Sequence, residues 1–325
     1  MDVLSLIPTP ASIDQAAADL QPVLRPTPVM TSSSIASLVD RQMLHLKPEN
    51  LQRTGSFKFR GAYTKVHRLA PKLGHQGIVT YSSGNHGQAV ALAAALHGVK
   101  AIVVVPEDAV PDKVEATLAY GAEVIRAGRT SLERKAAAED IAASHGWPIV
   151  HAFDDPDIIA GQATVGREIA LTVPDTDGVL VPVGGGGLAS GISLALSHLR
   201  PGLPIFGVEP EGANDAFLSL SGHHLVTLDH PETLADGLRT SRIGDLNFEI
   251  LSRHLAGIIT VSEASIRKAV RLLAQRAKLV VEPSGAVGLA ALLEGKASAL
   301  MSPTLVLSGG NVSAETLAIC LTESS

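Results

Sequence analysis

The sequence predicts an α/β protein made of two open α/β domains with largely parallel sheets. Short β-branched runs alternate with Ala- and Leu-rich stretches along most of the chain, which is the pattern of strands joined by helices. At 325 residues and 46% hydrophobic composition the chain can bury a large core, and its length favours about two domains. Only 3% of the residues are aromatic, so the core must consist of Ala, Val, Leu and Ile, which suits closely packed layers of helices on sheets.

The first alternating series begins at Gly77. Its predicted strands are GIVTYS, AIVVVP, AEVIRA and PIVHAF, and its predicted helices are residues 85–96, 112–120 and 131–144. Strands separated by helices of about ten residues or more imply right-handed crossovers and a parallel sheet. We expect this series to form a small domain of residues 73–152.

A second alternating series begins near Pro156. It contains a helix to Leu171, the strand GVLVPV, a helix after Gly187, the strand PIFGVEP and further helices that close on TLVLSGG, with an irregular part from His223 to Asn247. We expect residues 1–72 and 153–325 to form one large domain. Because no linker or low-complexity tract separates the two series, the domains should face each other across a cleft, with ligands beyond the carboxyl ends of the strands.

Composition points to a small-molecule partner. The net charge of -6 and the absence of a long Lys/Arg block argue against a nucleic-acid or anionic-membrane surface. The apolar stretch from residue 88 to 106 is interrupted by His97, Gly98 and Lys100, so it is not a membrane span. One cysteine, Cys320, cannot form an internal disulfide, and the first residues do not resemble a signal peptide. We therefore expect a cytoplasmic protein.

The segment TGSFKFRGA, residues 54–62, places Lys58 between Phe57 and Phe59 after a turn. An apolar setting disfavours the ammonium form and lowers the lysine pKa, as a lysine nucleophile requires. Taken alone, the same pattern also fits a surface lysine that opens a helix.

The strand GIVTYS leads directly into Ser82-Ser83-Gly84-Asn85-His86-Gly87, and a helix follows. Small residues here allow backbone N–H groups and the Ser and Asn side chains to approach a ligand at the helix N-terminus. The alternative is ordinary capping, since Ser and Asn are favoured N-caps, and His86 alone also fits a packed core histidine.

Four consecutive glycines, Gly184, Gly185, Gly186 and Gly187, follow the strand GVLVPV and precede a helix. This run is costly in chain entropy and exceeds what one turn needs, so it predicts a backbone cradle for an anion, such as a phosphate. The spacing and the position in mid-chain differ from the dinucleotide-binding fingerprint.

Five segments together carry a resemblance to a known family. SFKFRGA, SSGNHGQA, GGGGL, EPSGA and SGGN occur in this order across most of the chain and resemble the fold-type II pyridoxal-phosphate enzymes, whose architecture is tryptophan synthase beta-like. The likeness is closest to serine racemases and short serine/threonine dehydratases, and TPVMTSSS, DDPDIIAGQAT and ADGLRTS reinforce it.

The resemblance implies a role for each matching residue. Pyridoxal 5'-phosphate would be held by Lys58, with Phe57 beside its ring, Asn85 on its phenolic oxygen, Gly184 to Gly187 on its phosphate and Ser308 facing its pyridine nitrogen. The large domain would therefore bind the cofactor. The substrate would contact Ser82, Ser83, Asn85, His86, Arg134 and Ser241. Lys58 would remove the Cα proton, and Ser83, on the opposite face, would return a proton to give the D-amino acid. Arg134 also fits an exposed helix residue.

A divalent-cation loop is implied by the same resemblance. Glu209 and Asp215 would supply carboxylates and Ala213 a carbonyl, which are hard oxygen ligands suited to magnesium, calcium or manganese. The alternative is an acidic turn after a strand.

The implied function is an ammonia-lyase (dehydratase) that converts L-serine or L-threonine to a 2-oxo acid and ammonia, together with serine racemase activity. We also expect a homodimer. Arg242 is an extra residue beside Ser241 and could pair with a second substrate carboxylate, so 3-hydroxyaspartate dehydratase is an alternative. A non-catalytic ligand-binding α/β protein is the alternative from another class.

Overall fold

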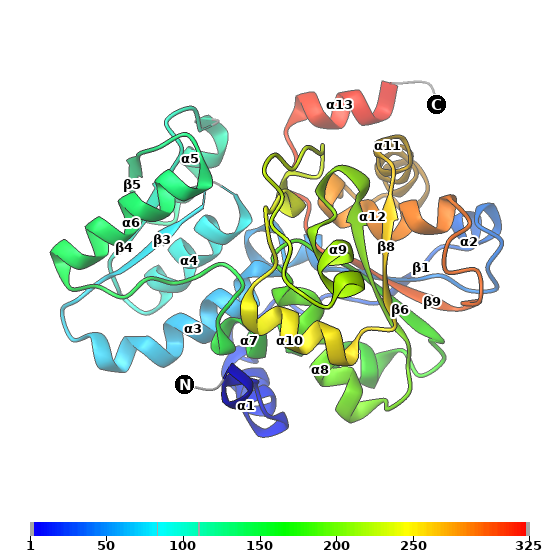
Figure 1. Ribbon diagram of the computed structural model, residues 1–325, viewed down its shortest axis with the longest axis horizontal. Coiled ribbons are helices and arrows are strands. Elements are labelled where there is room, and N and C mark those ends of the chain that lie inside the picture. The colour runs from blue at the N-terminus through cyan, green and yellow to red at the C-terminus, as the bar shows by residue number, and fades with distance from the viewer. Residues whose placement is uncertain (1–2, 83, 110, 323–325) are drawn as a thin grey trace.

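The computed structural model describes residues 3–82, 84–109 and 111–322, and these residues form two separate sheets flanked by helices (Figure 1). The strands are β1 Met30–Thr31, β2 His45–Pro48, β3 Ile78–Tyr81, β4 Ala101–Val105, β5 Glu123–Arg126, β6 Gly178–Pro182, β7 Ile205–Pro210, β8 Gly257–Val261 and β9 Pro303–Leu307. The α-helices are α1 Pro10–Leu20, α2 Ser33–Leu38, α3 Lys58–Leu73, α4 Asn85–Leu96, α5 Pro111–Ala119, α6 Ser131–His145, α7 Pro156–Thr172, α8 Gly187–Leu199, α9 Asp215–Gly222, α10 Asp245–His254, α11 Glu263–Leu272, α12 Pro283–Leu293 and α13 Ala314–Thr322.

The large sheet has the strand order β1-β2-β9-β6-β7-β8, and the small sheet has the order β3-β4-β5. Neighbouring strands are parallel in both sheets, apart from the antiparallel pair β1–β2. The small sheet lies at the left of Figure 1 and the large sheet at the right. The predicted fold class is confirmed.

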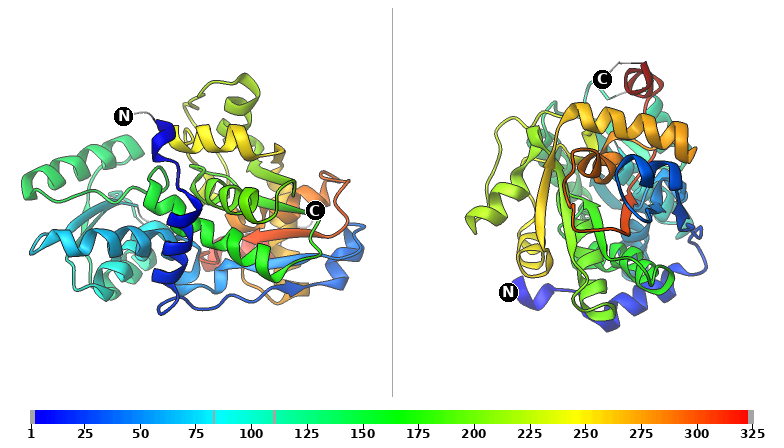
Figure 2. Two further views of the ribbon diagram at one scale, coloured as in Figure 1. Left: turned by 90° about the horizontal axis from the view of Figure 1, so that it is seen from below. Right: turned by 90° about the vertical axis from the view of Figure 1, so that its right-hand side faces the viewer.

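Both sheets are covered by helices on both faces, as expected for parallel sheets (Figure 2). In the small sheet, Val79, Ile102 and Val104 pack with α6, whereas Ile78 and Val103 pack with α3 and α4. In the large sheet, leucines of β6 and β9 pack with α11 and α12, and valines of β6 pack with α7 and α8.

Helices α3 and α7 cross at two glycines. A Cβ added to Gly161 would lie 2.6 Å from the carbonyl oxygen of Arg60 and from Cα of Gly61, and a Cβ added to Gly61 would lie 2.8 Å from the carbonyl oxygen of Ile158. The two backbones are therefore in direct contact at the first turn of α3.

A buried ion cluster anchors the same turn of α3. The guanidinium of Arg60 is fully buried and donates to both carboxylate oxygens of Glu49 at 2.8 Å and to Glu168 at 2.6 and 2.9 Å. Lys47 of β2 donates to Glu168 at 2.6 Å and to the carbonyl oxygen of Thr27 at 2.9 Å. Two cations and two carboxylates thus balance inside the protein.

The structure corrects the predicted strand PIVHAF. Only an isolated bridge between Val79 and Ile149 forms there, because Pro148 has no N–H to donate and the chain beyond Val150 leaves the sheet. Strands β1, β2 and β8 are absent from the prediction. The predicted irregular stretch is confirmed up to Gly244, apart from a short 3-10 helix at Asp236–Leu238, and its last three residues belong to α10.

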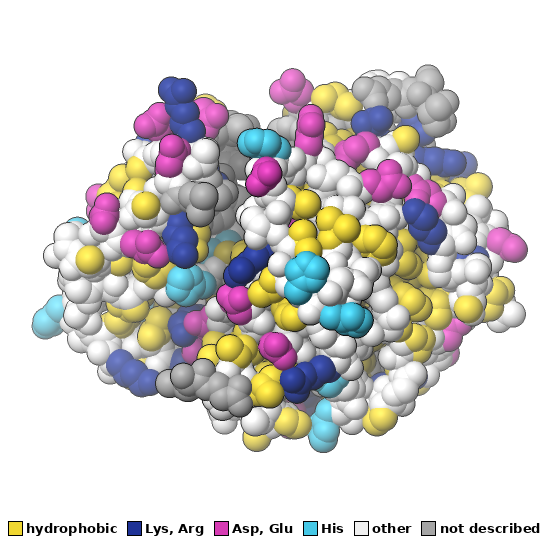
Figure 3. Space-filling view, viewed as in Figure 1, with side chains coloured by type: hydrophobic (Ala, Val, Ile, Leu, Met, Phe, Trp, Pro, Cys, Tyr) yellow, Lys and Arg dark blue, Asp and Glu magenta, His cyan; other side chains and the backbone are white. Residues whose placement is uncertain are grey.

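The surface in Figure 3 shows acidic and basic side chains interspersed on one face of the molecule. Among the described helices, none has both the length and the apolar character needed to cross a membrane.

Candidate active site

Lys58 is the first residue of α3. Its Nζ donates to the carbonyl oxygen of Ala152 at 2.9 Å and lies 5.2 Å from the centre of the Phe57 ring. Burial lowers the pKa of Lys58 to about 8, and the negative charge of Glu282 opposes this shift. Because the pKa lies near neutrality, a useful fraction of this amine is unprotonated at physiological pH.

The loop before Lys58 is fastened to the loop after β9. Phe57 N donates to the carbonyl oxygen of Ser308 at 3.0 Å, and Gly310 N donates to that of Gly55 at 2.9 Å. Thr54 and Gly55 both have positive φ, 57° and 73°, which is a costly conformation for the threonine. These bonds place Lys58 beside Ser308, which is buried.

The four glycines form a tight loop at the N-terminus of α8. Gly186 has φ 94° and caps the helix, and a Cβ on Gly185 would overlap the ring of Phe153. A Cβ on Gly187 would lie 3.0 Å from the carbonyl oxygen of Phe153. The loop therefore has no room for side chains, and the free N–H groups of the first helical turn can bind an anion.

The segment Ala152 to Asp154 joins Lys58 to this glycine loop. Ala152 accepts from Lys58, Phe153 packs against Gly185, and the Asp154 carboxylate accepts from the first N–H groups of α10 at 3.0 and 3.1 Å. The lysine and the anion cradle, which are more than 120 residues apart in the sequence, are thus parts of one site.

Asn85 and Glu282 lie at this site and contact each other. Asn85 is the first residue of α4, and its Nδ2 donates to Glu282 Oε1 at 2.8 Å. The cap of α4 is Gly84, which provides no side-chain hydrogen bond, so Asn85 is available to bind a ligand rather than the helix end.

His86 has a fixed tautomer. Its Nε2 lies 3.1 Å from the carbonyl oxygen of Val150, and because a carbonyl only accepts, Nε2 carries the hydrogen. Burial and the nearby charge of Lys58 lower the pKa of His86 to about 3, so the ring is neutral. Nδ1 is buried and has no partner among the described residues. Because Nδ1 carries no hydrogen, it cannot donate to a substrate carboxylate. A carboxylate at this end of α4 would bind backbone N–H groups.

The other predicted substrate residues in the described part of the chain make local contacts. Ser82 Oγ accepts from Gly84 N at 3.3 Å, and Ser83 lies outside the described residues. Arg134 is half-buried on α6 and donates to the carbonyl oxygen of Arg129 at 3.1 Å. Ser241 is exposed before α10, and its carbonyl oxygen accepts from Leu228 N at 2.8 Å.

Arg242 is engaged by its own loop. Its guanidinium pairs with Asp245 at 2.9 Å, and its side chain is 39% exposed. A second substrate carboxylate at Arg242 would have to replace Asp245 as the partner of this guanidinium.

The predicted cation loop is a buried acidic cluster. Glu209 is fully buried and accepts from Ala216 N at 3.1 Å and Phe217 N at 2.8 Å. Asp215 is also fully buried, and neither of its carboxylate oxygens accepts a hydrogen bond of good geometry in the described structure, although the backbone N–H groups of Asp215 and Ile243 lie close enough to oppose the rise of its pKa. Burial raises the pKa of Asp215 to about 7, and burial together with the charge of Asp215 raises the pKa of Glu209 well above its usual value. Two buried, unsatisfied carboxylate oxygens fit a cation.

The third predicted ligand is a backbone group. Ala213 lies in a short 3-10 helix, Glu211–Ala213, and is fully buried. Within residues 3–322, apart from residues 83 and 110, no group of three or more His, Cys, Asp or Glu side chains is arranged to hold a metal ion. A cation here would therefore need carbonyl or water oxygens beside the two carboxylates.

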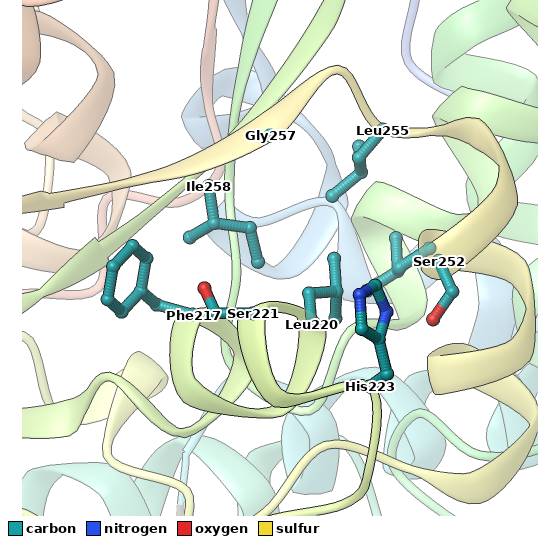
Figure 4. Close-up of a pocket in the computed structure, with 9 residues that line it drawn as sticks. Phe217, Leu220, Ser221, His223, Ser252, Leu255, Gly257 and Ile258 are labelled. Atoms are coloured by element: carbon teal, nitrogen blue, oxygen red, sulfur yellow. The ribbon is translucent and has the colours of Figure 1, made fainter.

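A pocket of about 380 Å³ lies between α9, α10 and β8 (Figure 4). Phe217, Leu220, Leu255 and Ile258 line it, with Ser252 at its rim. None of its lining residues is a predicted site residue, and no cluster of charged groups surrounds it.

The structure also identifies site residues that the sequence did not assign. Glu282 and Asn311 contact Asn85, and the carbonyl of Ala152 contacts Lys58. The segments EPSGA and SGGN mark the first two as polar groups beside small residues, but no sequence pattern shows which atoms they meet. A backbone carbonyl has no sequence signal at all.

Comparison with known proteins gives consistent matches along the chain. Residues 20–309 match the family model described as pyridoxal-phosphate dependent enzyme. The chain is 41% identical to an L-threo-3-hydroxyaspartate ammonia-lyase of Saccharomyces cerevisiae, over 94% of each chain. It is 40% identical to an L-threonine ammonia-lyase of Thermotoga maritima, over 92% of this chain and 75% of the relative. The solved structure of maize serine racemase superimposes with a TM-score of 0.92, at 37% identity and 95% coverage of each chain.

Proposed function

Because this chain belongs to the family of pyridoxal-phosphate-dependent enzymes, we propose that it is an ammonia-lyase that converts L-serine or L-threonine to a 2-oxo acid and ammonia. The observation that carries this proposal is that Lys58 and the glycine cradle at the N-terminus of α8 lie in one site. The pKa of Lys58 there is about 8. Membership in an enzyme family argues against the alternative of a non-catalytic ligand-binding protein.

The residues of the site fit the cofactor. The glycines pack so closely against Phe153 and Asn247 that none can carry a side chain, and the bare backbone N–H groups at the start of α8 suit a phosphate. Lys58 would hold the aldehyde carbon, Phe57 and Asn85 would contact the ring, and Ser308 would face its nitrogen. When bound, pyridoxal phosphate withdraws electrons from the Cα atom of the amino acid.

The side chains of this protein supply the remaining steps. Backbone N–H groups at the start of α4 bind the substrate carboxylate and orient the Cα–H bond. Lys58 Nζ accepts the Cα proton, which its lowered pKa permits near neutral pH. Neutral Ser308 leaves the ring less electron-withdrawing than an aspartate would, and this favours prompt loss of the β-hydroxyl.

We extend the proposal to serine racemisation. Its support is the structural match to maize serine racemase, together with a serine at position 83, which would return a proton on the face opposite Lys58. Ser82, Asn85 and His86 belong to the same proposed substrate pocket, and Arg134 and Ser241 would close it from the other side.

The substrate assignment rests on two observations. Relatives named for 3-hydroxyaspartate and for threonine are about equally similar to this chain, so similarity does not favour the dicarboxylate. In addition, Arg242 already has a carboxylate partner, Asp245, within its own loop. We therefore retain serine and threonine as the main substrates.

We also propose a structural magnesium, calcium or manganese ion at Glu209, Ala213 and Asp215. The supporting observation is the unsatisfied, buried Asp215 carboxylate beside Glu209. A homodimer in the cytoplasm, with a large cofactor-binding domain of residues 1–72 and 153–325 and a small domain of residues 73–152, completes the proposal. The separation of the two sheets supports this division into domains.

The decisive experiment is a substrate comparison with purified protein. Rates of 2-oxo acid formation are measured on L-serine, L-threonine and L-threo-3-hydroxyaspartate, with D-serine measured in parallel. We expect turnover of serine and threonine. Turnover of 3-hydroxyaspartate alone would contradict the substrate assignment, and no 2-oxo acid from any of the three would contradict the proposed reaction.

A further inference from the structure

Three side chains from distant segments form a line of hydrogen bonds beside Lys58. Asn311 Nδ2, in the loop after β9, donates to Asn85 Oδ1 at 2.6 Å, and Asn85 Nδ2 donates to Glu282 Oε1 at 2.8 Å. Glu282 directly precedes α12, is nearly buried, and acts electrostatically on Lys58. The Asn85 amide thus lies within the lysine site and is held from both ends.

The order of atoms along this line is set by one backbone carbonyl. Asn311 Nδ2 also lies 2.7 Å from the carbonyl oxygen of Thr54, and because that oxygen only accepts, the atom facing it must be the amide nitrogen. The same nitrogen only donates, so the atom of Asn85 that faces it must be the oxygen. The nitrogen of Asn85 is therefore turned toward Glu282.

Counting hydrogens shows what this orientation leaves free. Both hydrogens of Asn311 Nδ2 are used, one by Thr54 and one by Asn85. Only one hydrogen of Asn85 Nδ2 is used, by Glu282, and the described part of the chain offers no acceptor for the other. We propose that Asn311 is a positioning residue, which fixes the direction of the Asn85 amide and so directs one N–H at the bound cofactor.

Local backbone geometry supports this role. Thr54 adopts φ 57°, which presents its carbonyl to Asn311, and the next residue is a glycine at φ 73°. A Cβ on Gly55 would overlap the side-chain oxygen of Asn311. The turn before Lys58 is thus shaped around the Asn311 side chain. The inference rests on the proposed cofactor site.

The test replaces the donor without changing shape. Asn311→Asp removes both hydrogen-bond donors, so nothing fixes the direction of the Asn85 amide any longer: in either orientation its oxygen faces a carboxylate, at position 311 or at Glu282. The matched control is Asn50→Asp, because Asn50 Nδ2 donates to the carbonyl oxygen of Val280 at 3.0 Å and does not contact Asn85. Both variants lose an amide donor to a backbone carbonyl in the same region.

Three measurements separate positioning from stability. They are the apparent dissociation constant of pyridoxal phosphate, the visible absorption spectrum of the bound cofactor and the melting temperature of the cofactor-free protein. We expect Asn311→Asp to weaken cofactor binding about 10-fold, the equivalent of one lost hydrogen bond, and to change the spectrum. Asn50→Asp should keep the affinity and the spectrum of the wild type, even if its melting temperature falls equally.

A rescue variant keeps the inference falsifiable if Asn311→Asp folds poorly. In the double variant Asn311→Asp with Glu282→Gln, complementary bonds to Asn85 form in the reversed sense, so the melting temperature should recover in part, although the carbonyl oxygen of Thr54 still lacks its donor. Affinity and spectrum should stay altered relative to Glu282→Gln alone, because in the double variant the amide is held in the reversed direction. Two outcomes would overturn the role of Asn311. One is recovery of affinity, spectrum and melting temperature together in the double variant, and the other is a wild-type affinity and spectrum in Asn311→Asp. A wild-type protein that binds no pyridoxal phosphate would instead contradict the proposed function.

Discussion

At the scale of single residues, the lowered pKa of Lys58 suits it to accept a proton, but it also lowers the free energy of unfolding near neutral pH. Its pKa in the folded protein is about 8, against 10.5 for a free lysine, because burial disfavours the ammonium form. Between these values the unfolded chain binds more protons than the folded one, so the free energy of unfolding of the cofactor-free protein should rise with pH. The full difference corresponds to at most about 3 kcal/mol.

Replacement of Lys58 by methionine should abolish turnover and should also remove the rise of the free energy of unfolding with pH. Urea unfolding of the cofactor-free protein at pH 7.5, 9 and 10 measures the effect. Lys72→Met, at an exposed position of the same helix, is the control and should follow the wild type. A Lys58→Met protein with normal ammonia-lyase activity would remove Lys58 from the mechanism.

Ser83 should affect racemisation much more than elimination. Lys58 alone can remove the Cα proton and allow the hydroxyl to leave, whereas racemisation needs a second acid on the opposite face. Ser83→Ala should therefore lower the ratio of D-serine to pyruvate formed from L-serine by about 10²- to 10⁴-fold. Ser82→Ala is the control, since Ser82 Oγ accepts from Gly84 N and should affect both products alike. An unchanged ratio in Ser83→Ala would show that this serine is not the second acid.

At the scale of elements, the first turn of α3 depends on the buried ion cluster. Arg60→Leu would leave Glu49 buried without its cation, and this should lower the free energy of unfolding by about 3 to 5 kcal/mol. Arg68→Leu, on the same helix, breaks a partly exposed pair with Asp157 and should cost about 1 kcal/mol or less. Urea unfolding measures both variants. Equal losses would mean that the cluster contributes no more than a surface pair.

The loop between β7 and α9 should respond to pH and to cations together. Raised pKa values mean that the folded protein binds more protons than the unfolded chain, so in chelator stability should fall as pH rises from about 4 to about 7. Magnesium or calcium should reverse this fall, with a larger rise in melting temperature at pH 8 than at pH 5.5. Glu209→Gln and Asp215→Asn should lose the response. Equal melting temperatures of the wild type in chelator and in saturating magnesium at pH 8 would identify this loop as a plain turn.

At the scale of the whole molecule, the sequence predicts the elements whose signal is local. Alternating apolar runs predict β3, β4, β6, β7 and β9, and glycine and lysine patterns predict the two ends of the site. Strand β2 escapes prediction because half of it is polar: Lys47 is buried only because Glu168, 121 residues away, neutralises it. Likewise, PIVHAF has the composition of a strand, but its backbone leaves the sheet to bring the Ala152 carbonyl to Lys58.

The contact between α3 and α7 at Gly61 and Gly161 also restricts how this sequence can change. Each position meets the backbone of the other helix, so no smaller neighbouring side chain can make room for a substitution, and the two positions cannot compensate for each other. In a saturation-mutagenesis library, both glycines should reject even alanine, singly and together. Stepwise substitution is therefore not tolerated where α3 packs most closely against α7. This restriction should hold whatever substrate the enzyme comes to prefer.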